Sequence, residues 1–213
     1  MSGAWRSLLA AFGVIALTAP ALAQAKKQPP APPAVAVPDN VDVAYGAYQR
    51  GLYLTALAEA SKRAQQNDPH AMTLLGEIYA QGLGIGRDDG KAAQWYKQAA
   101  SLGDRDAMFA LAMFAFEGRA GARNVDEAAR LLESAANLGH AAAAYDLGLL
   151  YLQGQQFPQN FNRAAELFRA AADAGNAEAQ YALATMIKEG RGVPKNPRQA
   201  TLLMGKASIA GNV

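Results

Sequence analysis

The sequence contains no cysteine, and this absence excludes several kinds of site. Without thiols the 213-residue chain has no disulfide bond, no thiolate nucleophile, no Cys-ligated zinc or iron–sulfur cluster and no lipid-modified cysteine. Charge is scarce as well, since charged residues make up 18% of the chain, with 20 basic against 18 acidic side chains. This near-neutral balance argues against nucleic acid as the main partner.

Alanine is abundant instead, at close to a quarter of all residues, and 51% of the chain is hydrophobic. Alanine is the best helix former, and glycine and proline fall at spaced positions that leave helix-length segments between them. The composition therefore predicts an all-α protein of one or two domains.

The N-terminus is typical of a secretory signal peptide over residues 1–23. Arg6 precedes an apolar run at 8–17, which is followed by Pro20 and by the small-residue segment 21–23. An apolar run of about ten residues is half of what a bilayer span needs, so a permanent anchor is the weaker interpretation and no stable membrane span is expected after cleavage. The protein is thus predicted to be exported, to the periplasm if its source is a Gram-negative bacterium and otherwise to the medium.

A proline-rich segment comes after the signal peptide. Residues 24–39 hold five prolines among Ala, Val, Gln and Lys, a composition that supports neither a helix nor a core. We expect an extended, polyproline-like linker there. The folded part is expected to begin near Asn40, with a short-looped helical hairpin over 40–68 that caps its N-terminal end.

The remainder is one unit of 36 residues that occurs four times. Three columns that show the period without any slip of register are Gly103, Gly139, Gly175 and Gly211; Gly82, Gly118, Gly154 and Gly190; and Leu75, Leu111, Leu147 and Leu183. This agreement predicts one repeat each over 69–104, 105–140, 141–176 and 177–213.

Each unit predicts two helices. In the first unit, one helix carries Ala71, Leu75 and Tyr79 on one side and ends at Gly82, where a left-handed residue terminates a helix at little cost. Two columns of small residues predict that the helices of a unit approach closely, with small residue against small residue. These columns are Gly76, Ala112, Gly148 and Ala184, and Ala92, Ala128, Ala164 and Ala200. The positions expected to cap the next unit are Asp104, His140, Asn176 and Asn212, of which the histidine is the poorest cap.

The first unit reads Leu75-Gly76-x-x-Tyr79-x-x-Gly82-x-Gly84-Ile85-x-x-Asp88, then Lys91-Ala92-Ala93-x-Trp95-Tyr96-x-x-Ala99-Ala100-x-x-Gly103. This pattern resembles the Sel1-like repeat, a relative of the tetratricopeptide repeat with a longer internal loop, and the resemblance covers residues 71–212 as four units. Units two and three depart from it in the loop, at 118–121 and 154–158. The resemblance implies an exported bacterial member with an all-α fold, a right-handed α-solenoid of stacked helix-loop-helix repeats that has a concave side.

The C-terminal end lacks the polar capping helix that such arrays require. Residues 211–213 fall at the start of a fifth unit, and the last predicted helix would leave Leu202, Leu203 and Ile209 uncovered. We therefore expect that the natural protein continues beyond this point or that this end docks on something, self-association included.

Catalytic constellations are nearly absent from the sequence. His70 and His140 lie about two repeats apart, roughly 20 Å or more, which is too far to ligate one metal ion. The segment 84–91 superficially resembles a phosphate-binding loop, but its glycine spacing is wrong and Ala92 follows where Ser or Thr is needed. The β-lactamase motifs Ser-x-x-Lys and Lys-Thr-Gly do not occur. Carboxylates stand singly on predicted helix surfaces, as at Glu77, Glu117, Asp126 and Glu133. We predict no catalytic residue, no cofactor and no metal site.

The strongest functional signal is a stripe of large apolar side chains on the first helix of units two to four. This apolar stripe consists of Phe109, Met113, Phe116, Tyr145, Leu149, Leu152 and Tyr181. By resemblance to the tetratricopeptide family, this side lines the concave groove in which a partner's peptide or helix lies. The alternative is that the same side chains fill contacts between neighbouring first helices and are simply core.

These features favour an exported, non-enzymatic scaffold or regulatory adaptor that binds another envelope or secreted protein along its concave face. The alternative is a cell-wall or surface-glycan enzyme with a dispersed site, β-lactamase-like or acting on peptidoglycan. A third hypothesis, a structural spacer in the envelope, has only the proline-rich linker in its favour.

Overall fold

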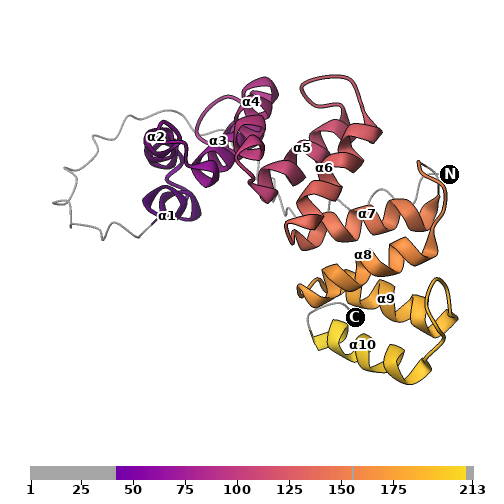
Figure 1. Ribbon diagram of the computed structural model, residues 1–213. Helices are drawn as coiled ribbons and strands as arrows, with labels where there is room; N and C mark the ends of the chain where they lie inside the picture. The colour runs from indigo at the N-terminus through magenta and orange to yellow at the C-terminus, as the bar shows by residue number, and fades with distance from the viewer. Residues whose placement is uncertain (1–41, 155, 210–213) are drawn as a thin grey trace, which may run out of the picture. The chain divides into compact units, whose positions relative to one another are not determined.

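The computed structural model describes residues 42–154 and 156–209, and these residues form ten α-helices (Figure 1). The helices are α1 (Val43–Gln49), α2 (Tyr53–Ala64), α3 (Pro69–Gln81), α4 (Asp89–Ser101), α5 (Arg105–Glu117), α6 (Val125–Asn137), α7 (Ala141–Gln153), α8 (Phe161–Asp173), α9 (Ala177–Glu189) and α10 (Pro197–Ile209). The predicted signal peptide and the predicted linker lie outside the described residues.

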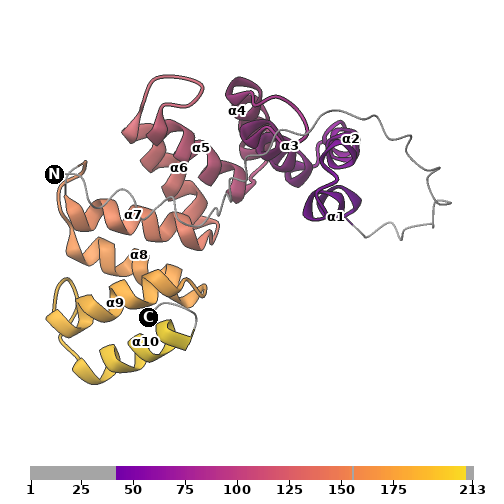
Figure 2. The same cartoon turned by 180° about the vertical axis from the view of Figure 1, so that it is seen from behind.

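Helices pack in the order in which the chain makes them. Each helix contacts the one before it and the one after it, which Figures 1 and 2 show from opposite sides. The pairs α1–α2, α3–α4, α5–α6, α7–α8 and α9–α10 succeed one another as hairpins, so the predicted all-α solenoid is confirmed. Such a stack has no single central core, and each repeat buries its apolar faces against its neighbours.

The helices of the repeats begin at capping side chains. A side-chain acceptor binds a backbone N–H of the first turn at Asp68, Asp88, Asp104, Asn124, His140, Asn160, Asn176 and Asn196. His140, expected to be the poorest of these caps, accepts from Ala143 N through Nδ1 at 3.0 Å. Each cap satisfies a backbone donor that the helix itself leaves unpaired, and thereby fixes where the helix starts.

The first helix of each repeat ends on a left-handed glycine, as the column of Gly82, Gly118, Gly154 and Gly190 predicts. Gly82 has φ 71°, and a Cβ there would lie 2.9 Å from the backbone N of Arg87, so both conformation and space demand glycine. The same cap recurs at Gly118, Gly154 and Gly190. Asn67 follows the end of α2, 36 residues before Gly103, and so belongs to the glycine column that ends the second helices. It has φ 61°, a conformation that asparagine tolerates better than most residues.

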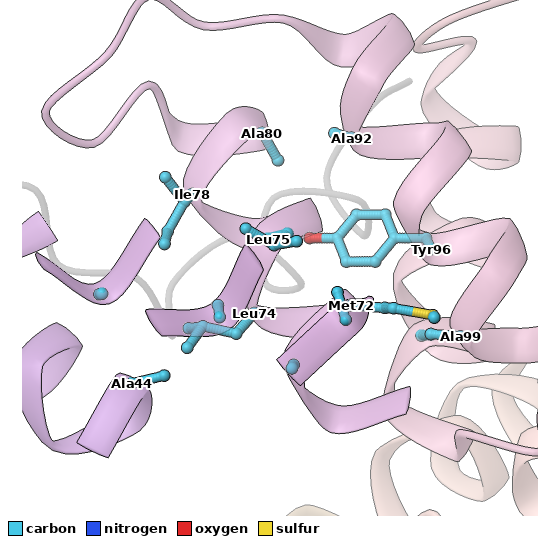
Figure 3. Packing of buried hydrophobic residues seen from close by; sticks show 14 of the residues in the cluster. Ala44, Met72, Leu74, Leu75, Ile78, Ala80, Ala92, Tyr96 and Ala99 are labelled. Atoms are coloured by element: carbon cyan, nitrogen blue, oxygen red, sulfur yellow. The ribbon is translucent and has the colours of Figure 1, made fainter. Parts of the chain in front are cut away.

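Packing inside a repeat differs from the expected contact of small residue with small residue. The atoms nearest to the missing Cβ of Gly76 belong to the Tyr96 ring of α4, and Figure 3 shows this ring reaching across to α3 beside Leu75. In the third repeat the Phe168 ring covers Gly148 in the same way. The expectation was wrong at these two positions because a glycine without Cβ lets an aromatic ring lie directly on the helix backbone.

The last helix keeps an uncovered side within the described residues. Leu202 is 65% exposed and Ile209 is 91% exposed, while Leu203 is half-buried. Among the ten helices, none is both long enough and apolar enough to cross a bilayer.

Candidate functional site

The apolar stripe lies on α5, α7 and α9, the first helices of repeats two to four. These helices have the same length, begin at the caps Asp104, His140 and Asn176, and end at left-handed glycines. Because caps fix the register of each helix, residues 36 positions apart stand at equivalent places on consecutive helices. The stripe is therefore a repeated surface feature rather than a coincidence of sequence.

The apolar stripe is partly buried and partly exposed, which fits both interpretations that the sequence leaves open, a partner-binding surface and core packing. Six members are half-buried, and all six pack against the hydrophobic core clusters of their repeats. Phe109 stacks on His140, the N-cap of α7, with ring centroids 4.5 Å apart, and Tyr145 lies 5.6 Å from the Phe168 ring of α8. Tyr181 is different, since it is 55% exposed. The stripe thus contributes to packing on its inner side and presents apolar surface on its outer side.

The two histidines act at the joints between repeats. His140 caps α7 through Nδ1, and its Nε2 lies 3.5 Å from an oxygen of Asp106. Burial lowers the pKa of His140 against the opposing effect of Asp106. His70 is largely exposed, with Nδ1 2.9 Å from Oδ2 of the buried Asp104, which caps α5. Both side chains are thus occupied structurally, and they belong to different joints of the stack.

One acidic side chain of the first repeat, Glu77, is also paired within the fold. Glu77 on α3 accepts hydrogen bonds from the Tyr48 hydroxyl at 2.8 Å and from Gln81 Nε2 at 2.9 Å. Burial and this acceptor raise the pKa of Tyr48. The contact joins α1 to α3, so it fastens the N-terminal hairpin to the first repeat.

Asp146 is a functional candidate that the sequence reasoning missed. It comes directly after Tyr145 on α7, is only 6% exposed, and neither a hydrogen bond nor an ion pair reaches its carboxylate from the described residues. Burial and the nearby charge of Glu178 raise the pKa of Asp146 to about 7. The signal was present in the sequence, because the equivalent positions in the other repeats are the apolar residues Leu74, Ala110 and Ala182.

Metal binding finds no support among the described residues, which contain no group of three or more His, Asp or Glu side chains placed to hold an ion. The arrangement combines three features. It presents rigid helices, half-exposed aromatic and aliphatic side chains, and one buried carboxylate beside them.

Comparison with known proteins identifies the repeats. The family model described as "Sel1 repeat" matches residues 69–104, 105–140, 141–176 and 177–212, which together exceed half of the chain. No curated protein is a significant match to the sequence.

Several solved structures are similar. A Sel1 repeat protein of Oxalobacter formigenes is 34% identical with a TM-score of 0.73, and the match covers 75% of this chain and 46% of that one. A protective antigen of uropathogenic Escherichia coli is 26% identical with a TM-score of 0.71, over 79% of this chain and 38% of the antigen. A Sel1 repeat protein of Klebsiella pneumoniae is 27% identical with a TM-score of 0.53, over 79% and 84% of the two chains. The chain thus spans less than half the length of the first two of these proteins.

Proposed function

The chain belongs to the Sel1 repeat family, a helical scaffold typical of protein-binding proteins, and from this premise we propose that it is a non-enzymatic adaptor that holds a segment of another protein against the apolar stripe. The observation that carries the proposal is the half-exposed stripe on three consecutive first helices, which ends in the 55% exposed Tyr181. An exposed tyrosine beside half-buried aliphatic and aromatic side chains is the kind of surface at which interfaces concentrate their binding energy.

Rigidity of the stripe supports the same function. Its side chains project from capped helices and rest on the cores of their repeats, so little conformational entropy is lost when a partner binds. Met113 adds an adaptable side chain to this surface, which suits a partner that is a peptide or helix.

Tyr181→Ala tests the proposal best, because this side chain is 55% exposed, whereas Phe109 packs on the cap of α7 and Tyr145 packs on Phe168 within its own repeat. The matched control is Tyr45→Ala, which removes a 52% exposed tyrosine from α1, outside the stripe. Affinity capture from the envelope fraction of the source organism, followed by mass spectrometry and by binding assays with the purified partner, measures the effect. We expect the partner to be recovered with wild type and Tyr45→Ala and lost with Tyr181→Ala, at unchanged helicity. Equal recovery with all three proteins would contradict the proposal.

Export is part of the proposed function, supported by the sequence of residues 1–23. Cell fractionation locates the protein, and N-terminal sequencing of the native form is expected to begin at Gln24. A native chain that keeps residues 1–23 in the cytoplasm would contradict export and would place the partner in the cytoplasm as well.

One observation favours the second candidate, a glycan-cleaving enzyme. Burial raises the pKa of Asp146 to about 7, Glu178 lies near it, and an acid that keeps its proton near neutral pH beside a second acidic side chain is the arrangement that glycosidases use. Turnover of purified peptidoglycan by wild type, and its loss in Asp146→Asn but not in Tyr181→Ala, would establish the enzyme and remove the adaptor. We expect no turnover by any of these proteins.

A further inference from the structure

Asp146 has no structural reason to be an acid. The other buried carboxylate among the described residues, Asp104, is 4% exposed and caps α5 by accepting from Ala107 N at 2.8 Å. Asp146 is as deeply buried, lies within a helix rather than at its start, and has no hydrogen-bond or ion-pair partner in the described chain. An ionised carboxylate that is only 6% exposed loses most of its hydration without compensation, so it destabilises the free protein.

The other repeats show that the fold accommodates apolar residues at this position. The equivalents of Asp146 are Leu74, Ala110 and Ala182, and these three residues occupy the same position of α3, α5 and α9. Glu178 on α9 adds to the destabilisation of the free protein, because its negative charge disfavours ionisation of Asp146. Both observations indicate that the acid serves something outside the described chain.

Charge is distributed unevenly between the two kinds of helix. The first helices α3, α5, α7 and α9 carry six carboxylates against two basic side chains, whereas the second helices α4, α6, α8 and α10 carry six against seven. The residues of the first helices are the acids Glu77, Asp106, Glu117, Asp146, Glu178 and Glu189 and the bases Arg105 and Lys188. The three helices that carry the apolar stripe, α5, α7 and α9, hold five of these acids and both bases. Asp106, Glu117 and Glu189 already face bases of the chain, whereas no ion pair reaches Asp146 or Glu178 from the described residues, and these two acids favour a cationic segment.

Resting on the proposed function, we propose that the segment bound on the apolar stripe carries a lysine or arginine whose charged group pairs with Asp146. Such a residue supplies the ionic partner that the buried carboxylate lacks, and its aliphatic stem lies among the neighbouring Tyr145 and Leu149. An ion pair completed only on binding contributes specificity, since a segment without the basic residue leaves a buried acid unpaired.

Selection from a randomised dodecapeptide library, with the full chain as bait, provides the probe. We expect the enriched peptides to combine apolar residues with a lysine or arginine. One enriched peptide is then synthesised with its basic residue and with norleucine in that place, which keeps the length and removes the charge. Affinities of both peptides are measured for wild type, Asp146→Ala, Asp146→Asn and Tyr181→Ala.

Asp146→Ala is expected to lower the affinity for the basic peptide by about thirtyfold or more. This is the smaller end of what removal of one partner from a buried ion pair costs. Asp146→Asn, which keeps the shape, is expected to give a comparable loss, and the norleucine peptide should bind wild type and Asp146→Ala with similar affinity. Asp173→Ala, which removes an exposed carboxylate from the last turn of α8, is the matched control and should change neither affinity by more than about twofold. The stability of Asp146→Ala distinguishes binding from a purely structural role. If Asp146 acts in binding, this variant should fold and be more stable than wild type while it binds the basic peptide less well.

The outcomes separate this inference from the proposed function. Enriched peptides that lack a basic residue, or that bind Asp146→Ala as well as wild type, yet are weakened by Tyr181→Ala, would overturn the role of Asp146 and leave the adaptor intact. Absence of enrichment, or enriched peptides that neither Tyr181→Ala nor Asp146→Ala weakens, would overturn both.

Discussion

Replacing Gly148 by alanine tests how the two helices of a repeat hold each other. In an exposed helix this change stabilises by about 1 kcal/mol, because glycine is a poor helix former. Here the new Cβ would lie 2.7 Å from Cε1 and 2.9 Å from Cδ1 of Phe168, whose side chain is fully buried and cannot move aside. We take about 2–3 kcal/mol for the cost of this overpacking, the upper part of the usual range. After the gain of about 1 kcal/mol from helix propensity, we expect the free energy of unfolding to fall by about 1–2 kcal/mol.

A second substitution should rescue the first. The second repeat has Ala112 and Leu132 where the third has Gly148 and Phe168, and both are fully buried in one cluster. Phe168→Leu alone leaves space over the glycine and should cost about 1–2 kcal/mol. Combined with Gly148→Ala it recreates the pair of the second repeat, so the two changes should couple favourably by about 1–2 kcal/mol.

Urea unfolding followed by circular dichroism measures all four proteins of this cycle. Gly205→Ala in α10 is the matched control, since a Cβ there meets no atom within 4 Å, and it should stabilise by about 1 kcal/mol. Stabilisation by Gly148→Ala, or additivity of the two changes within about 0.5 kcal/mol, would refute the packing argument.

Three further predictions concern single positions. Because burial and Glu178 raise the pKa of Asp146 from 3.8 to about 7, the folded protein holds this proton more tightly than the unfolded chain. The contribution of Asp146 to stability should therefore rise as pH falls from about 7 to about 4, by up to about 4 kcal/mol, while His140, whose pKa is lowered by burial, acts in the opposite direction in both wild type and variant. Asp146→Asn should remove this contribution, which urea midpoints at about pH 8 and about pH 5 check. The same change of midpoint with pH in wild type and Asp146→Asn would count against it. Ala120 adopts φ 55° where Gly84 stands one repeat earlier, so Ala120→Gly should stabilise by about 0.5–1 kcal/mol in calorimetry, and a lower Tm would speak against this. Ala128 is fully buried, so Ala128→Leu should cost about 1–3 kcal/mol by overpacking, which an unchanged urea midpoint would disprove.

Helix ends could be predicted from the sequence because their chemistry is local. A left-handed cap needs glycine or asparagine, and an N-cap needs a short polar side chain, so the positions of Gly82, Asn67 and Asp104 already mark boundaries. Which column of one helix meets which column of its partner is not local, since it depends on how the two helices cross. The bulky residues Tyr96 and Phe168 lie over the glycines, although the columns alone suggested alanine as their neighbour.

The stripe and the buried acid differ in what the sequence reveals. Periodicity placed large apolar side chains on one side of three helices, but only coordinates show that Phe109 and Tyr145 are half-buried and that Tyr181 is exposed. Asp146 was not predicted because it is neither a bulky residue nor a member of a cluster of acids in the sequence. An acid in an apolar column was the available signal, whereas its burial and lack of a partner depend on how α7 packs.

A stack of repeats is well suited to carry such an acid. Helices contact mainly their neighbours in the chain, so the destabilisation caused by Asp146 is confined to α7 and the helices packed around it. In the same repeat Phe168 is completely buried over Gly148, so the two helices of this repeat remain closely packed. A recognition residue can therefore occupy one repeat while the others keep leucine or alanine at its position, which is how a series of near-identical units can present one specific site.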